Sequence, residues 1–188
     1  MAENKVNFGI EKLYYSVITE ETGGVITYGD PVHLPGAVSM ELSIKGETND
    51  FYADNIAYYT TVSNQGYEGT ITVANITEAF RTNVLGETLE STDKVLTETS
   101  SANPKKLAIM VEFDGDQKAT RHCLYYCTLT RPGLSATTKT ETAEPGTSEL
   151  TFVAGPRPGD NVVKRSTTTE TTSTVYDGWF TKVYEPTA

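Results

Sequence analysis

The segment LAIMVEFDGDQKATRHCLYYCTLT, residues 107–130, decides the fold class of this 188-residue chain. Apolar residues occupy every second position from Leu107 to Phe113, which is the period of a β-strand. Asp114-Gly115 follows, and a second strand-like run returns from about Ala119 to Thr130. An Asp-Gly pair between two such runs predicts a β-hairpin, so the segment indicates antiparallel β structure.

Strand patterns continue on both sides of this hairpin. Residues 5–18 alternate with a change of phase near Glu11-Lys12, which predicts a bulge or bend. Residues 37–45 alternate again, and a tyrosine-bearing strand is expected over 56–62. Downstream, a long and mostly polar strand is expected over 161–174. Many short strands separated by turn residues are typical of a β-sandwich or barrel.

One helix is expected, at about residues 75–86. Asn75 is a good N-cap, and Glu78 stands three residues later at the spacing of a capping box. Apolar residues then recur at helical spacing, and Gly86 stands where a left-handed C-terminal cap belongs. The sequence thus predicts a mainly β fold with one flanking helix. The length suits a single domain over 1–188, with flexible segments expected at 46–55, 87–104 and 136–149.

The composition bounds the function. Hydrophobic residues make up 37 % and charged residues 21 %, and the formal net charge is −10. Such a chain repels phosphate backbones at long range, which fits either an ordinary acidic protein or a surface that stays near DNA without binding it. No run of about 18 apolar residues is present, so no membrane-spanning helix is expected. The first residues lack the pattern of a secretory signal.

The search for reactive groups predicts no catalytic residue, no metal site and no cofactor. His122, Cys123 and Cys127 lack the second ligand pair of a zinc site. On a strand the two cysteines stand about 13 Å apart at ~3.3 Å per residue, too far for a disulfide, so reduced thiols are expected. Asp114 and Asp116 fit a hairpin turn better than a calcium loop. The chain is therefore not expected to be an enzyme.

An ordered series of segments resembles a known family: FYADN at 51–55, Tyr58-Tyr59, GYEGTITV at 66–73, and a helix that ends in VLGE. Together with VNFGIEKLYY at 6–15, they resemble the major tail protein, or tail tube protein, of long-tailed, non-contractile phages (siphophages) that infect Gram-positive bacteria. The resemblance covers about residues 5–130.

The resemblance implies a β-sandwich subunit that closes into hexameric rings, which stack into a tube for genome delivery. It implies other tail proteins as partners, such as the tape measure, tail-tip and terminator proteins. DNA would pass through the lumen without specific binding, the location would be the tail of the virion, and assembly would occur in the host cytoplasm. A long loop or hairpin, here about 45–59, would hold the adjoining ring. Its candidate contact residues are Phe51, Tyr52, Asp54, Asn55, Tyr58 and Tyr59.

Two other classes of function remain open at this point. A β-sandwich binding module, or an adhesin-like domain of a phage or bacterial surface, would stay monomeric or form closed oligomers. An acid-based hydrolase would need a cleft that gathers two or more carboxylates beside an aromatic platform.

Overall fold

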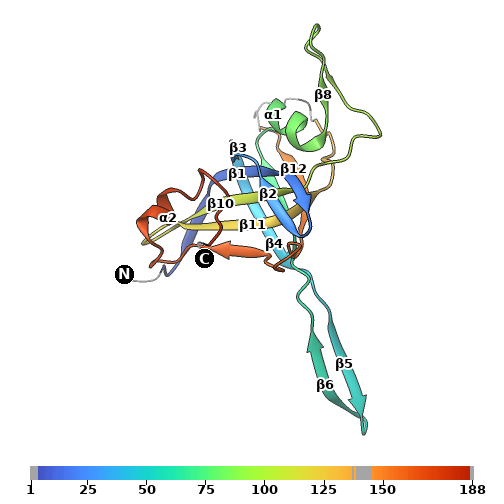
Figure 1. Cartoon of the computed structure of the whole chain (residues 1–188), viewed down its shortest axis with the longest axis vertical. Helices are drawn as coiled ribbons and strands as arrows, with labels where there is room; N and C mark the ends of the chain where they lie inside the picture. Colours follow the sequence, from blue (N-terminus) through green and yellow to red (C-terminus); the bar gives the residue numbers. More distant parts are fainter. Residues whose placement is uncertain (1–3, 137, 139–144, 187–188) are drawn as a thin grey trace.

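A curled, nine-stranded antiparallel sheet forms the body of the protein (Figure 1), in a computed structural model that describes residues 4–136, 138 and 145–186. The main path of the sheet is β2-β1-β10-β11-β12-β7-β4, while β3 pairs with β1 and β13 pairs with β11. The sheet strands are β1 (Asn7–Thr22), β2 (Val25–Tyr28), β3 (Val32–His33), β4 (Ala37–Ile44), β7 (Tyr67–Val73), β10 (Leu107–Gly115), β11 (Thr120–Leu129), β12 (Ser148–Ala154) and β13 (Lys164–Ser166). The predicted mainly β, sandwich-like class is confirmed.

Strand β10 is buried on both faces, which explains its unbroken apolar start. Because successive side chains point to opposite faces, Leu107, Ile109 and Val111 enter the main core inside the curled sheet. Ala108 and Met110 instead enter a second core on the outer face of β10 and β11.

The predicted hairpin and bulge are both present. Strands β10 and β11 pair in antiparallel register, and the chain reverses at residues 116–119. Asp114 and Gly115 are the last residues of β10, so the Asp-Gly pair marks the hairpin but does not form its turn. Asn4 stabilises this turn, because its side-chain oxygen accepts a hydrogen bond from the backbone N–H of Lys118 at 3.0 Å. Lys12 has a φ of 47°, and the β1–β10 register shifts between Glu11 and Tyr14, which places one extra residue on β1.

The flanking helix begins later than the sequence indicated. It consists of α1 (Glu78–Phe80) followed directly by the π-helical turn η1 (Arg81–Leu85). The N-cap is Thr77, whose hydroxyl accepts the backbone N–H of Phe80 at 3.3 Å, so the expectation that Asn75 is the N-cap was wrong. The predicted end is confirmed, because Gly86 adopts the left-handed conformation with φ 76°.

A C-terminal strap, defined as residues 156–186, covers the second core. It contains only the short strand β13 and the helix α2 (Ser173–Asp177). The long strand expected over 161–174 was therefore wrong. Trp179 and Val183 of the strap pack against Met110 and Tyr125 in the second core. The strap is therefore held by side-chain packing on the second core and not by the hydrogen bonds of a long strand.

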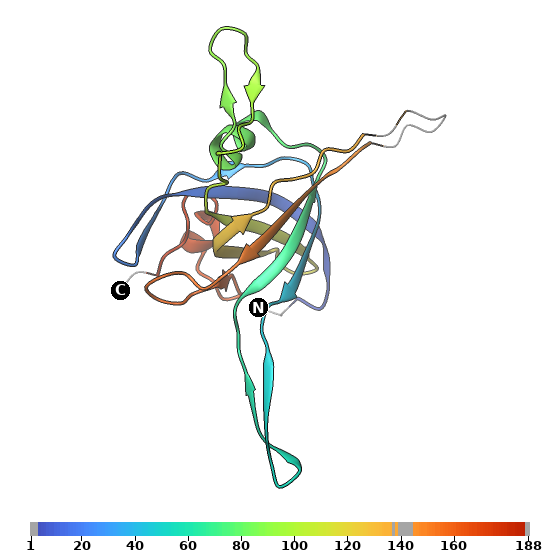
Figure 2. The ribbon, with the colours of Figure 1, turned by 90° about the vertical axis from the view of Figure 1, so that its right-hand side faces the viewer.

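Two hairpins project from opposite ends of the body (Figures 1 and 2). Strands β8 (Thr88–Leu89) and β9 (Leu96–Thr97) form one of them, beside α1. Strands β5 (Thr48–Ala53) and β6 (Ile56–Val62) form the other, longer one. The hairpin expected at about 45–59 is thus confirmed and reaches Val62. Strands occupy parts of 46–55 and 87–104, and the flexibility expected there stays a prediction. Most of 136–144 lies outside the described residues.

Candidate functional site: the projecting hairpin

The β5–β6 hairpin is closed by a two-residue turn. Ala53 pairs with Ile56, and the residues between them, Asp54 and Asn55, have φ values of 54° and 63°. Asp and Asn tolerate this left-handed conformation better than other non-glycine residues, and two such residues in a row form the turn that matches strand twist. Asp54 and Asn55 therefore form the tip of the hairpin.

Aromatic side chains lie on both faces of this hairpin. Phe51 pairs with Tyr59 across the strands, and Tyr52 pairs with Ala57. Since adjacent residues of a strand face opposite ways, Phe51 and Tyr59 share one face while Tyr52 lies on the other. Tyr58 is the extra residue at the register shift between these two pairs.

These side chains are exposed to solvent. Phe51, Tyr52, Tyr58 and Tyr59 are between 64 % and 69 % exposed. The hairpin is held mainly by its own strand pairing, a Thr60 hydroxyl that donates to the Asp50 carboxylate at 2.6 Å, and Ser63 at its base. Contiguous exposed apolar groups of this kind are typical of surfaces that contact another molecule, which is the role expected for this hairpin.

The structure brings all six sequence-predicted residues together on this one hairpin, and their contact role stays a prediction. Sequence reasoning missed Ile56 and Val62, which are 61 % and 75 % exposed and lie at the two ends of β6. The signal for them was present, because both belong to the tyrosine-bearing strand expected over 56–62, but a strand pattern does not tell which side chains are covered.

A second surface is acidic and lies on the outer face of strands β4, β7 and β12. Their inward residues, including Ile71 and Phe152, enter the main core. Outward residues are Ser, Thr and Glu in the main, with Glu41, Glu68 and Glu149 exposed. None of the three strands contains Lys or Arg. We refer to this surface as the acidic face.

The requirements of the alternative chemistries are not met by the described residues. A surface hollow does bring Glu41 and Glu68 together, but the aromatic residue beside them, Phe152, is fully buried and offers no platform. Burial, with a smaller contribution from Lys164, lowers the pKa of His122 to about 4. Within residues 4–136, 138 and 145–186, no cluster of His, Cys, Asp and Glu has the size to hold a metal. No helix in the described part of the chain has the length and apolar character to cross a membrane.

Fold and surface together define the class of protein: a structural β-sandwich subunit with a projecting, aromatic hairpin. The chain belongs to the phage tail tube protein family, which it matches over residues 2–156. The match ends where the C-terminal strap begins. The chain is therefore a structural component of a phage tail.

A solved structure shares the fold. It is the cryo-EM structure of the anti-feeding prophage cap, described as the tube terminating cap, with a TM-score of 0.50 and 11 % identity. The superposition covers 89 % of this chain and 96 % of the cap chain. Comparison with curated protein sequences gives no match.

Proposed function

We propose that this chain is the subunit of the tail tube, and that it self-assembles into hexameric rings stacked head to tail around the channel for genome delivery. The observation that carries the proposal is the β5–β6 hairpin, with exposed aromatic residues on both of its faces. Tyr and Phe bury much area with few rotatable bonds, which suits permanent contacts between subunits.

Head-to-tail stacking requires two different complementary surfaces on each subunit, because such an interface must repeat without closing. The hairpin supplies one of them. At about 3.3 Å per residue, the six residues of β5 extend roughly 20 Å from the body, a reach that suits contact with an adjoining ring. Residues such as Phe51 and Tyr52 then become buried only when rings stack.

The acidic face is the part of the subunit that suits the lumen. Glu41, Glu68 and Glu149 project from a sheet face whose strands have no basic residue. DNA in contact with such a wall releases no counterions, so it gains no binding free energy and slides. With the acidic face on the lumen, DNA passes through the tube without specific binding.

The remaining parts of the proposal concern the context of the tube. The chain acts as one domain, without catalysis or cofactor, in the tail of the virion. It assembles in the host cytoplasm, where the buried thiols of Cys123 and Cys127 stay reduced. Its partners are further copies of itself and other tail proteins, such as the tape measure, tail-tip and terminator proteins.

Negative-stain electron microscopy of the concentrated protein tests the assembly. We expect rings or hollow tubes of uniform diameter, formed alone or after addition of tail-tip components as an initiator. A particle that stays monomeric in both conditions would overturn the proposal and favour the binding module.

The lumen assignment has its own test. Tubes of the triple variant E41K/E68K/E149K should retain double-stranded DNA in a sedimentation assay at low salt, whereas wild-type tubes should not. As a control for total charge, three Glu→Lys changes at Glu20, Glu90 and Glu170, outside the acidic face, should retain much less. Equal retention by both triple variants would contradict the assignment.

A further inference from the structure

A small groove lies at the end of the molecule opposite the β5–β6 hairpin. It is bordered by η1 and by the segment that follows β11, and it includes Ile76, Leu85, Pro132 and Leu134. Its volume is about 140 Å³. Small-molecule sites usually have about 300–1,000 Å³, so the groove suits a protein side chain better than a cofactor.

The position of the groove is the one that a repeating stack needs. The β5–β6 hairpin projects from one end of the long axis, and α1, which runs directly into η1, lies at the other end (Figures 1 and 2). When one subunit is stacked on the next by translation along this axis, its hairpin approaches the end of its neighbour that bears the groove. The two surfaces are different, as an interface that propagates requires.

The chemistry of the two surfaces is complementary. Leu134 is 95 % exposed at the groove, an apolar side chain that nothing in the described structure covers. Two guanidinium groups, those of Arg81 and Arg131, also border the groove, and they pair with Glu87 and Glu98. The hairpin region 46–64 has three carboxylates and no basic residue. The Glu98 side chain is 58 % exposed, so an incoming carboxylate displaces it from Arg131 at little cost.

From these observations we infer that the groove beside η1 receives the tip of the β5–β6 hairpin from a second copy of this chain in the adjoining ring. Phe51 and Tyr59 then pack against Leu134 and Pro132, and the Asp54 carboxylate approaches Arg131. The inference rests on the proposed tube function and adds the receiving surface, which is built from the helical segment around η1 and the segment that follows β11.

Cross-linking of introduced cysteines tests the contact. The native thiols do not interfere, because Cys123 and Cys127 are buried and burial raises the pKa of both, that of Cys123 to about 12. The test variant is A57C/G133C, which joins an exposed hairpin position to a groove position where an added Cβ meets no atom within 4 Å. The matched control is A57C/S91C, with the second cysteine on the β8–β9 hairpin at the same end of the molecule.

Each variant is assembled on its own, treated with a short bifunctional maleimide and separated by denaturing electrophoresis. We expect cross-linked dimers and higher species from A57C/G133C, at least fivefold more than from A57C/S91C or from either single variant. Wild-type-like tubes in which A57C/G133C gives no more product than the control would overturn the inference and leave the tube function intact. Failure of the wild-type chain to form tubes under any condition would overturn the proposed function and this inference with it.

Discussion

The β5–β6 hairpin and the C-terminal strap both lie outside the main core, and both are rich in aromatic residues. In the strap these residues are packed: Trp179 is 3 % exposed and stacks on Tyr184 with ring centroids 5.3 Å apart. In the hairpin, Phe51 and Tyr58 are more than 60 % exposed. The same residue types thus serve two purposes. The strap uses its aromatic residues to stabilise its own chain, whereas those of the hairpin stay exposed, as the proposed contact with another subunit requires.

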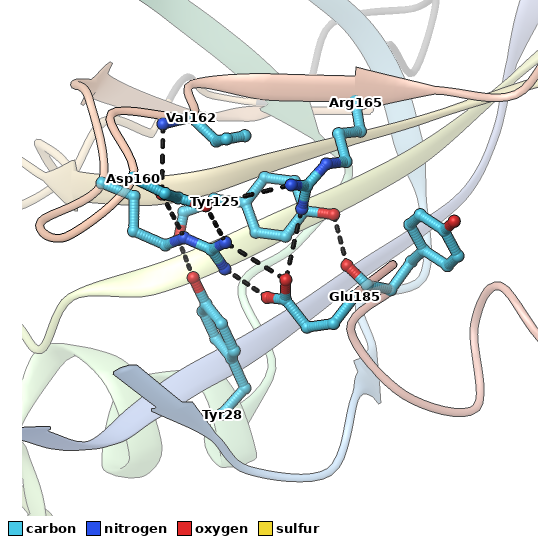
Figure 3. Close-up of polar contacts among 8 residues, drawn as sticks. Tyr28, Tyr125, Asp160, Val162, Arg165 and Glu185 are labelled. Carbon is cyan, nitrogen blue, oxygen red and sulfur yellow. Dashed lines mark hydrogen bonds and ion pairs between the residues drawn. The ribbon is translucent and has the colours of Figure 1, made fainter. Parts of the chain in front are cut away.

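The strap is fixed at two places. Arg121 of β11 lies between the buried Glu112 carboxylate, 2.5 Å from its Nε, and the Tyr176 ring of α2, 3.7 Å from its guanidinium carbon. At the second place, Arg157 donates hydrogen bonds to Asp160 and Glu185. Both carboxylates are labelled in Figure 3. Arg165 also donates to Glu185, at 3.2 Å, so the beginning and the end of the strap are joined. The β5–β6 hairpin has no comparable ion-pair network among the described residues.

The largest expected effect on stability comes from Trp179→Ala. Removal of a buried aromatic side chain costs about 3–5 kcal/mol of unfolding free energy, and here it also opens the second core around Met110 and Tyr125. Urea denaturation followed by circular dichroism measures the change, since Trp179 is the only tryptophan. A loss below about 1 kcal/mol would show that the strap contributes little to the fold.

Arg157→Gln is expected to have a smaller effect, about 1–2 kcal/mol. It removes charge-assisted hydrogen bonds to Asp160 and Glu185, and the exposure of both carboxylates reduces their value. Quenching of Trp179 fluorescence by acrylamide should increase, because the strap opens more often. Lys5→Gln, far from the strap in sequence, serves as the control. If quenching is unchanged in R157Q, the ion pairs of Arg157 do not contribute to holding the strap closed.

Acid should loosen the strap. The hydrogen bonds from Arg157 are the main cause that lowers the pKa of Asp160 to about 2 from 3.8, and burial lowers that of His122 to about 4 from 6.5. In both cases the unfolded state takes up protons first, so stability is full above about pH 6.5 and falls between pH 6.5 and 2. The urea midpoint, read from Trp179 fluorescence, should therefore decrease steadily on acidification. A constant urea midpoint from pH 7 to pH 3 would show that the lowered pKa values of Asp160 and His122 do not contribute to stability.

The smallest effect on stability is expected for the hairpin variant F51S/Y59S. Because both side chains are exposed, the free energy of unfolding should change by less than about 0.5 kcal/mol per residue. Polymerisation, measured by light scattering and electron microscopy, should nevertheless be lost. Asn49 and Thr61 form the next cross-strand pair on the same face, so N49S/T61S is the matched control and should still assemble. If F51S/Y59S forms normal tubes, Phe51 and Tyr59 are not needed at the interface between subunits.

Local patterns in the sequence determined much of the fold. Alternation over 107–113, the Asp-Gly pair at 114–115 and the phase change near Glu11-Lys12 correctly predicted the central hairpin and the bulge in β1. The projecting hairpin, with the six candidate residues on it, was instead implied by the family resemblance. The end of the helix at Gly86 was predicted from its local pattern. These features depend on backbone conformation within a few residues, which the residue types specify directly.

Only the tertiary structure decided what covers each surface. Residues 161–174 are rich in Thr and fit a strand, but contacts with the outer face of β10 and β11 hold them as a strap with a short helix. Thr77 replaced Asn75 as the N-cap because the packing of Phe80 and Val84 in the core sets where the helix begins. Tyrosines occur both in the hairpin and in the strap. Their exposure differs because periodicity marks the two faces of a strand, whereas burial depends on segments that are distant in the sequence.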